Sequence, residues 1–261
     1  MGYLVTELFE KEFSETIGCK ESIAVNSGTS ALIASLWSMD LQGKEVITTP
    51  FTFIATSNAI VIAGGVPVFV DIHEDTHLIN EDLVEAAVNE NTAAIIPVHL
   101  FGRLCDVDRM MKFGVPVIED AAQAFGAQFE DGRFAGAVGD AGCFSFYKRK
   151  NFSTFEGGMI SVNSESRLDA DKMRSIIDQG QSGRFNHEYL GFNFRMPELC
   201  ALLGLERIQC HMHGIQSELG LRDERHGAYP RVVYDQPIYK KLGIKGDCPI
   251  AERVARDVRE S

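Results

Sequence analysis

The sequence lacks the features that mark several classes of protein. No apolar run approaches the roughly 18 residues of a transmembrane helix, and no charged-then-apolar leader opens the chain. None of the six cysteines forms a Cys-x-x-Cys pair, a usage typical of free thiols in a reducing compartment. These absences predict a cytoplasmic protein with no membrane partner.

Positive charge is also scarce. The chain carries 25 Lys and Arg against 37 Asp and Glu, for a formal net charge of −12. This balance argues against non-specific binding of nucleic acid. An anionic substrate must therefore be attracted by local cations and helix N-termini. With 261 residues, 45% of them hydrophobic, the chain can bury a substantial core in one large α/β domain, or in one domain and part of a second.

Common catalytic and metal-binding signatures are absent as well. There is no Gly-x-Ser-x-Gly elbow and no Walker loop. Cys210, His211 and His213 resemble metal ligands, but adjacent residues point apart on a helix and no fourth ligand is nearby. No metal site is expected.

Up to about residue 160, apolar runs alternate with amphipathic stretches. Several runs are continuously apolar, which is typical of strands buried on both faces of a mostly parallel sheet covered by helices. Ligands in such sheets bind beyond the carboxyl ends of the strands. The predicted strands are 23–26, 45–48, 66–70, 93–97, 115–118, 141–146 and 159–162, and the predicted helices are 29–39, 52–63, 81–88, 167–178 and 197–209. From about residue 214 the chain is polar and turn-rich, and we expect weak organisation there.

Three stretches place polar residues where a ligand would bind. Gly28 permits a tight turn between a strand and a helix, so this helix start either binds a phosphate or is only capped. Asp120 ends a buried strand, where a carboxylate needs a cation or donor, or serves as a helix cap. The cations at 148–150 follow another strand. Crowding could leave one lysine partly neutral and nucleophilic, unless the loop is simply solvated. Asn193 and Arg195 are either ligands or loop hydrogen bonders.

Together these stretches resemble the DegT/DnrJ/EryC1/StrS family of sugar aminotransferases, which depend on pyridoxal 5'-phosphate (PLP), within fold-type I. The resemblance runs from about Gly2 to Gln209 and rests on motifs in order: N-S-G-T-S-A-L, T-P-F-T-F-I-A-T, P-V-F-V-D-I, P-V-H-L-F-G, I-E-D-A-A-Q-A-F-G-A, F-S-F-Y-K-R-K-N, E-G-G-M-I and G-F-N-F-R-M. It implies an α/β fold with a mostly parallel sheet of the seven-stranded type, covered by helices. Residues 1–209 would form the PLP-binding large domain, and 210–261 a remnant of a shortened C-terminal small domain.

The resemblance also implies the cofactor and its site. Lys150 corresponds to the lysine that holds PLP as a Schiff base, five positions after the phosphate-binding Ser145. Asp120 corresponds to the carboxylate that pairs with the pyridinium nitrogen, which keeps the ring protonated as an electron sink. The other implied cofactor residues are Thr29 and Ser30 at the phosphate, Phe53 stacked on the ring and Gln123 near the phenolic oxygen.

Two further positions concern partners. Asn193 matches a phosphate ligand that the neighbouring subunit donates, which implies a homodimer with shared active sites. His187 stands where members of the family often place a residue near the substrate.

The implied activity is transfer of an amino group from an amino acid, with glutamate as the expected donor, to a keto-sugar carried on a nucleotide diphosphate. One alternative is a PLP-dependent sugar dehydratase, but those relatives replace the lysine with histidine, and Lys150 speaks against it. Another is a catalytically inactive binding or regulatory homologue, which the shortened small domain makes plausible. Lys148 and Arg149 stand where the family more often has uncharged residues, and they could help to hold anionic phosphates. The spacing from Ser145 favours Lys150 over Lys148.

Overall fold

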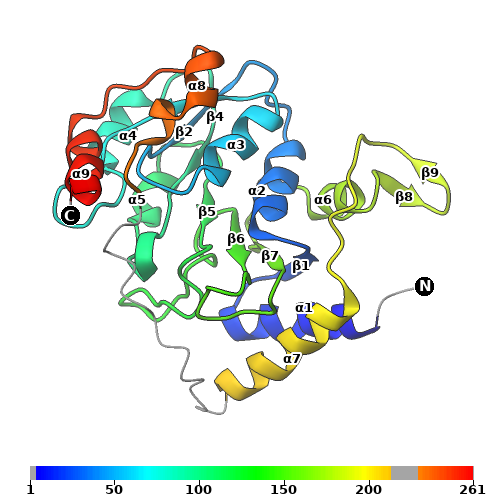
Figure 1. Ribbon diagram of the computed structural model, residues 1–261. Coiled ribbons are helices and arrows are strands. Elements are labelled where there is room, and N and C mark those ends of the chain that lie inside the picture. Colours follow the sequence, from blue (N-terminus) through cyan, green and yellow to red (C-terminus); the bar gives the residue numbers. More distant parts are fainter. Residues whose placement is uncertain (1–3, 213–228, 261) are drawn as a thin grey trace.

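The computed structural model describes residues 4–212 and 229–260 (Figure 1). Its helices are α1 (Leu4–Ile17), α2 (Gly28–Trp37), α3 (Ala55–Ile62), α4 (Glu81–Ala87), α5 (Val107–Met111), α6 (Ala170–Ile177), α7 (Glu198–Met212), α8 (Pro237–Lys241) and α9 (Pro249–Glu260). Its strands are β1 (Glu21–Val25), β2 (Glu45–Thr48), β3 (Val66–Phe69), β4 (Thr92–Ile96), β5 (Ile118–Asp120), β6 (Ala141–Ser145), β7 (Gly158–Val162), β8 (Gln181–Gly183) and β9 (Asn186–His187).

Two sheets meet to form one seven-stranded layer. Their strand orders are β1-β7-β6-β5 and β3-β2-β4. Parallel bridges from Ile95 to Val117 and from Val98 to Asp120 join β4 to β5. Among the described strands of this layer, β7 alone runs antiparallel to its neighbours, β1 and β6. The expected mostly parallel sheet is therefore confirmed, with β7 as the exception.

Helices cover both faces of this layer, with α2, α3 and α6 on one side and α4, α5 and α9 on the other (Figure 1). Alternation along the strands decides which face each residue joins, because successive side chains point to opposite faces. In β4, Ala94 and Ile96 pack with α2, whereas Ile95 packs with α4 and α5. In β6, Cys143 faces α2, and Phe144 packs with α1 on the other side.

The first helix, α1, was not predicted from the sequence. Its Phe9, Phe13 and Ile17 recur every four residues and are all buried, so they form one helical face. The Phe13 ring meets Phe144 edge-on at 5.0 Å, and α7 packs beside α1. This helix pair covers the end of the sheet that carries β1, β6 and β7.

The boundaries of several predicted elements shift, and two of the shifts concern elements that lead to the site. The strand expected at 115–118 is β5, Ile118–Asp120, because Pro116 has no N–H to donate to a ladder. Its carbonyl instead accepts from the Ile95 N–H at 2.9 Å. The helix expected at 52–63 begins only at Ala55.

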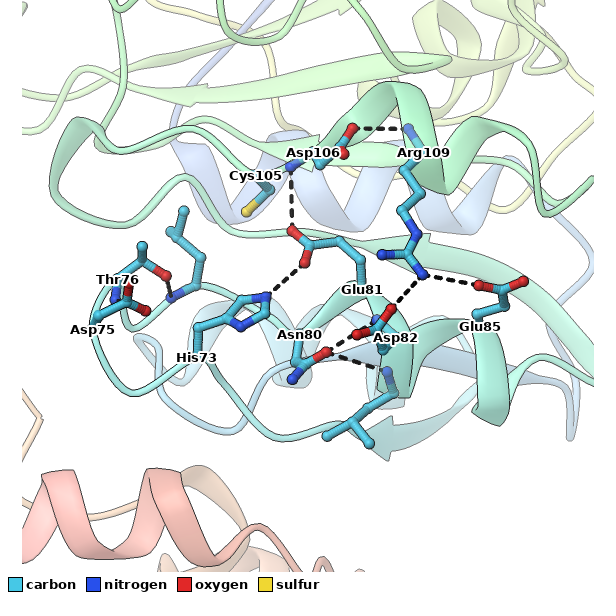
Figure 2. A network of polar contacts seen from close by, with 12 residues as sticks. His73, Asp75, Thr76, Asn80, Glu81, Asp82, Glu85, Cys105, Asp106 and Arg109 are labelled. Carbon is cyan, nitrogen blue, oxygen red and sulfur yellow. Dashed lines mark hydrogen bonds and ion pairs between the residues drawn. The ribbon is translucent and has the colours of Figure 1, made fainter.

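A polar network joins the stretch from His73 to Glu85 with α5 (Figure 2). Arg109 contacts Asp82 at 2.5 Å and Glu85 at 3.0 Å, and the Glu81 carboxylate accepts from the His73 ring at 2.6 Å. The pairs made by Arg109 are exposed, and solvent screening leaves such pairs little effect on stability. They fasten α4 to α5 at the outer layer and lie apart from the strand ends described below.

The C-terminal part packs onto the same core as β2 and β4. Residues 229–260 contribute Val232, Tyr234 and Ala251 to that cluster, and Asp71 accepts from the N–H groups of Ile250 and Ala251 at 2.8 Å each. The expected weak organisation is wrong for α9, whose apolar residues share one face and whose first turn is capped from a distant loop. Residues 214–228 of that prediction lie outside the described residues. The predicted domain boundary at 209/210 stays a prediction.

None of the helices described here combines the length and the apolar character that crossing a bilayer requires.

Candidate active site

Most of the predicted site residues gather where parallel strands end. Val25 of β1 and Ser145 of β6 both pair with Gly158, so the ends of these strands lie abreast in the sheet. Asp120 ends β5 next to β6. Carboxyl ends of parallel strands are the usual place for ligands in such sheets.

The turn from β1 into α2 forms a narrow cradle. Ser27 caps the helix, and its Oγ accepts from the Ser30 N–H at 3.1 Å. The Ser30 hydroxyl donates to Asn26 Oδ1 at 2.6 Å and is buried, whereas Thr29 is exposed. A Cβ placed on Gly28 would lie 2.7 Å from Ser145 Cβ, so only glycine lets the helix start lie against the end of β6. The helix N-terminus offers unpaired N–H groups and partial positive charge to an anion.

Asp120 is a buried carboxylate held by two donors. The Thr56 hydroxyl donates to Oδ2 at 2.7 Å, and the Ala122 N–H donates to Oδ1 at 3.2 Å. Burial raises the pKa of Asp120, although these hydrogen bonds and the charge of Lys150 act in the opposite direction. A carboxylate oriented in this way would gain from a cationic N–H partner.

Gln123 is held at both ends of its amide. Its Oε1 accepts from the Phe101 N–H at 2.9 Å, and its Nε2 donates to the Tyr229 hydroxyl at 2.8 Å. An N–H group can only donate, so Oε1 has to face Phe101 and Nε2 has to face Tyr229.

The structure separates the two candidate lysines. Lys150 is half-buried, and its charge acts on the pKa of Asp120. Lys148 and Arg149 are exposed, and Lys148 Nζ lies 5.9 Å from the centre of the Tyr147 ring. Asn151 anchors the loop by donating to the Phe125 carbonyl at 2.8 Å. The loop thus turns Lys150 toward the strand ends and leaves the other two cations in solvent.

Phe53 lies at the rim of this site. Its side chain is 61% exposed, and its carbonyl accepts from the Thr56 N–H at 3.4 Å. Because Thr56 also binds Asp120, the aromatic ring sits one helical turn from the residue that orients the carboxylate. An exposed ring here is available to stack on a ligand.

The remaining predicted residues lie farther out. The Asn193 carbonyl accepts from Asn26 Nδ2 at 3.3 Å, which fastens its loop beside the start of α2, and the Asn193 side chain is exposed. His187 is exposed in the β8–β9 hairpin, which projects from the body of the molecule (Figure 1). Arg195 forms an ion pair with Asp178, so it is a loop contact here.

Of the residues weighed as metal ligands, Cys210 and His211 lie in the last turns of α7, where the backbone alone is described. His213 lies outside the described residues. No group of three or more His, Cys, Asp or Glu suited to a metal ion occurs among the residues that the structure describes.

Sequence reasoning missed two residues at the site, Thr56 and Tyr229. Thr56 lies 64 positions from Asp120, and Tyr229 lies 106 positions from Gln123. Thr56 carried one signal, since it closes the T-P-F-T-F-I-A-T stretch. Tyr229 carried none, because the stretch around it matches no motif of the site.

Known proteins resemble this chain in sequence over most of its length. GDP-perosamine synthase of Caulobacter vibrioides is 37% identical over 235 residues, which are 86% of this chain and 62% of that protein. UDP-N-acetyl-3-dehydro-alpha-D-glucosamine 3-aminotransferase of Acidithiobacillus ferrooxidans is 38% identical over 199 residues, 74% of this chain and 53% of that protein. The chain therefore spans between about half and two thirds of the length of these relatives.

A solved structure agrees. An enzyme from Streptococcus pneumoniae that is named as a sugar aminotransferase, in its PLP form, superposes with a TM-score of 0.74 at 28% identity. The match covers 80% of this chain and 60% of the other. It confirms the expected fold-type I architecture. The family model for DegT/DnrJ/EryC1/StrS aminotransferases matches residues 2–219, and the chain belongs to that family.

Proposed function

We propose that the chain holds PLP covalently through Lys150 and transfers an amino group from an amino acid to a keto-sugar carried on a nucleotide diphosphate. The observation that carries this proposal is the meeting of Lys150, Asp120 and the glycine cradle at one edge of the sheet. When bound, the cofactor supplies an electron-withdrawing ring that stabilises negative charge at the carbon losing its proton.

The residues fit such a group. The start of α2 with Thr29 and Ser30, together with Ser145, would hold a phosphate, because the Gly28 cradle brings helix and strand end together. Asp120 would hold a proton on the ring nitrogen, and a cationic partner offsets the cost of burying its charge. Gln123 would donate to the phenolic oxygen.

The amine of Lys150 then has two tasks. It forms the covalent attachment, and once the donor amine displaces it, it moves a proton at the donor Cα. Phe53 would cover one face of the ring. Exposed Lys148 and Arg149 would attract the diphosphate, because the chain as a whole carries a net charge of −12.

The substrate class rests on the relatives' names, which include a GDP-perosamine synthase and an aminotransferase named for a UDP-linked 3-dehydro sugar. Glutamate is the proposed donor, and the cytoplasm, where the five described free cysteines stay reduced, is the proposed compartment. The principal alternative is an inactive homologue that binds a ligand without turning it over.

We further propose a homodimer in which Asn193 reaches the cofactor phosphate of the partner subunit and His187 lies near its substrate. The exposed side chain of Asn193 supports this. So do three large apolar residues close to it in the chain, because Phe185, Leu190 and Leu199 are 81%, 79% and 70% exposed. A subunit contact would remove such side chains from water.

The test is covalent labelling of the PLP-loaded protein with borohydride, followed by peptide mapping. The label is expected on Lys150 and should persist there in a Lys148→Ala control, while Lys150→Ala should lose both label and visible absorbance. A label on Lys148, or on no lysine, contradicts the assignment. Production of 2-oxoglutarate from glutamate with a panel of nucleotide-linked keto-sugars then separates a transaminase from an inactive homologue.

A further inference from the structure

Tyr229 brings the C-terminal part of the chain into contact with the site. It is the first described residue after the 213–228 gap and lies outside the 2–219 stretch that the family model matches. Its hydroxyl accepts from Gln123 Nε2 at 2.8 Å. Its ring lies nearly parallel to that of Phe101, with centres 6.4 Å apart, and meets Phe51 edge-on at 5.6 Å.

The backbone beside it is strained. Phe101 has φ of 56°, in the left-handed region that bulky residues rarely adopt. Such strain persists only where the surroundings hold it, and it concentrates at functional sites. Here the Gln123 amide accepts from the strained Phe101 N–H, and the Tyr229 ring packs on the Phe101 side chain. The three residues therefore form one clamp across the turns that follow β4 and β5.

The clamp selects one orientation of the amide. Oε1 is bound to Phe101, so the amide presents its Nε2 on the side of Tyr229. An amide nitrogen carries two hydrogens, and Tyr229 accepts one of them. The second hydrogen has no acceptor among the described residues, so Gln123 remains a donor for a ligand.

We propose that Tyr229 is a positioning residue of the active site, which keeps Gln123 oriented as a hydrogen-bond donor toward the phenolic oxygen of the bound cofactor. This inference rests on the proposed function, since it needs PLP in the site. Its consequence is electrostatic. A donor at that oxygen stabilises negative charge, which is greatest once the nitrogen joining Lys150 to the cofactor has lost its proton. A well-held Gln123 therefore lowers the pH at which that proton leaves.

The test is Tyr229→Phe, which keeps the ring and its packing and removes only the hydroxyl. Tyr239→Phe is the matched control, because it removes a hydroxyl of the same segment that donates to Asn58 Oδ1 at 2.9 Å and does not touch Gln123. We expect Tyr229→Phe to weaken PLP binding about three- to tenfold, as for one lost hydrogen bond. The pH midpoint of the visible absorbance change should also move upward. The control should leave both unchanged.

A double-mutant cycle isolates the coupling. In a Gln123→Ala background, adding Tyr229→Phe should change neither the midpoint nor the dissociation constant of PLP, because the proposed effect of the Tyr229 hydroxyl on the cofactor requires that amide. A purely structural Tyr229 would lower thermal stability in both backgrounds and leave the midpoint alone, which overturns the proposal. So does a Tyr229→Phe protein that matches wild type in both readouts. A wild-type protein that takes up PLP without any visible band contradicts the proposed function itself, and the role of Tyr229 falls with it.

Discussion

Replacing Gly28 with alanine tests whether the start of α2 must lie directly against the end of β6. The new Cβ would lie 2.7 Å from Ser145 Cβ, 3.2 Å from Ser145 Cα and 3.3 Å from the Phe144 carbonyl oxygen. Non-bonded carbon atoms pack at about 3.5–4.0 Å, so helix and strand have to separate by roughly 1 Å. None of the opposing atoms belongs to a flexible side chain that could rotate away.

The cost follows from this displacement. Forcing an extra methyl group into a packed interior costs about 1–3 kcal/mol. Alanine also restricts the unfolded chain, which offsets about 0.4–1 kcal/mol where φ is ordinary, as it is for Gly28. The free energy of unfolding should therefore fall by about 1–2 kcal/mol. Because the separation also moves the α2 N-terminus away from Ser145, PLP binding should weaken about tenfold or more, the equivalent of about 1.4 kcal/mol.

Urea unfolding of the apoprotein and absorbance titration with PLP measure the two effects. Gly183→Ala is the control: it is exposed in β8, and its Cβ would meet nothing nearer than Asn186 Cβ at 4.0 Å. This variant should stay within about 0.5 kcal/mol of wild type, as surface substitutions usually do. If Gly28→Ala matched Gly183→Ala in both measurements, the cradle would not be tight, and the phosphate assignment would lose its geometric basis.

Three further predictions concern charge and assembly. Asp120→Asn should slow transamination greatly while PLP binding survives in part. Burial raises the pKa of Asp120, so its charge at pH 7 disfavours the folded state, and urea unfolding should show that the Asp120→Asn apoprotein is no less stable than the wild-type apoprotein. Burial opposes ionisation of Asp140 too, but hydrogen bonds from Arg167 bring its pKa below the ordinary value, so the pair stabilises above about pH 4, the unfolded pKa. Arg167→Ala should therefore cost about 1–3 kcal/mol at pH 7, and its unfolding curve should approach that of wild type as the pH falls through the folded pKa; a pH-independent difference would count against this assignment. Mixing Lys150→Ala chains with Asn193→Ala chains should restore part of the activity after subunit exchange, because one site of each mixed dimer would be intact, whereas no recovery would mean that each chain builds its own site.

The strands could be predicted because each is a short apolar run, but the direction of β7 was missed. The sequence of β7, Gly158–Val162, is a short apolar run like those of the parallel strands, and all five of its residues are buried. The signal was in the connection. Residues 146–157 form no helix, and a parallel neighbour requires a crossover, usually helical. A short irregular loop between adjacent strands therefore favours the antiparallel pairing that the structure has.

The sequence pointed to candidate site residues where the pattern was local and gave no signal where the contacts were not. The turn at Gly28 and the end of β5 at Asp120 each lie within a few residues of a recognisable strand. The residues that orient them come from elsewhere, because Thr56 and Tyr229 reach the site only through the strand order and the packing of the C-terminal part. No spacing along the chain encodes those contacts.

The acidic pair that ends β5 illustrates the difference. Glu119 and Asp120 are adjacent and buried, and alternation along the strand sends them to opposite faces. Burial works to raise the pKa of Glu119, but His99, bonded at 2.7 Å, and the N–H groups of Gly136 and Gly139 bring it below its ordinary value. Glu119 is thus fully occupied by the protein. Asp120 keeps fewer donors and a raised pKa. Of these two neighbouring carboxylates, Glu119 therefore stabilises the fold. Asp120 lies on the face of α2 and α3, where a cationic ligand would neutralise its charge.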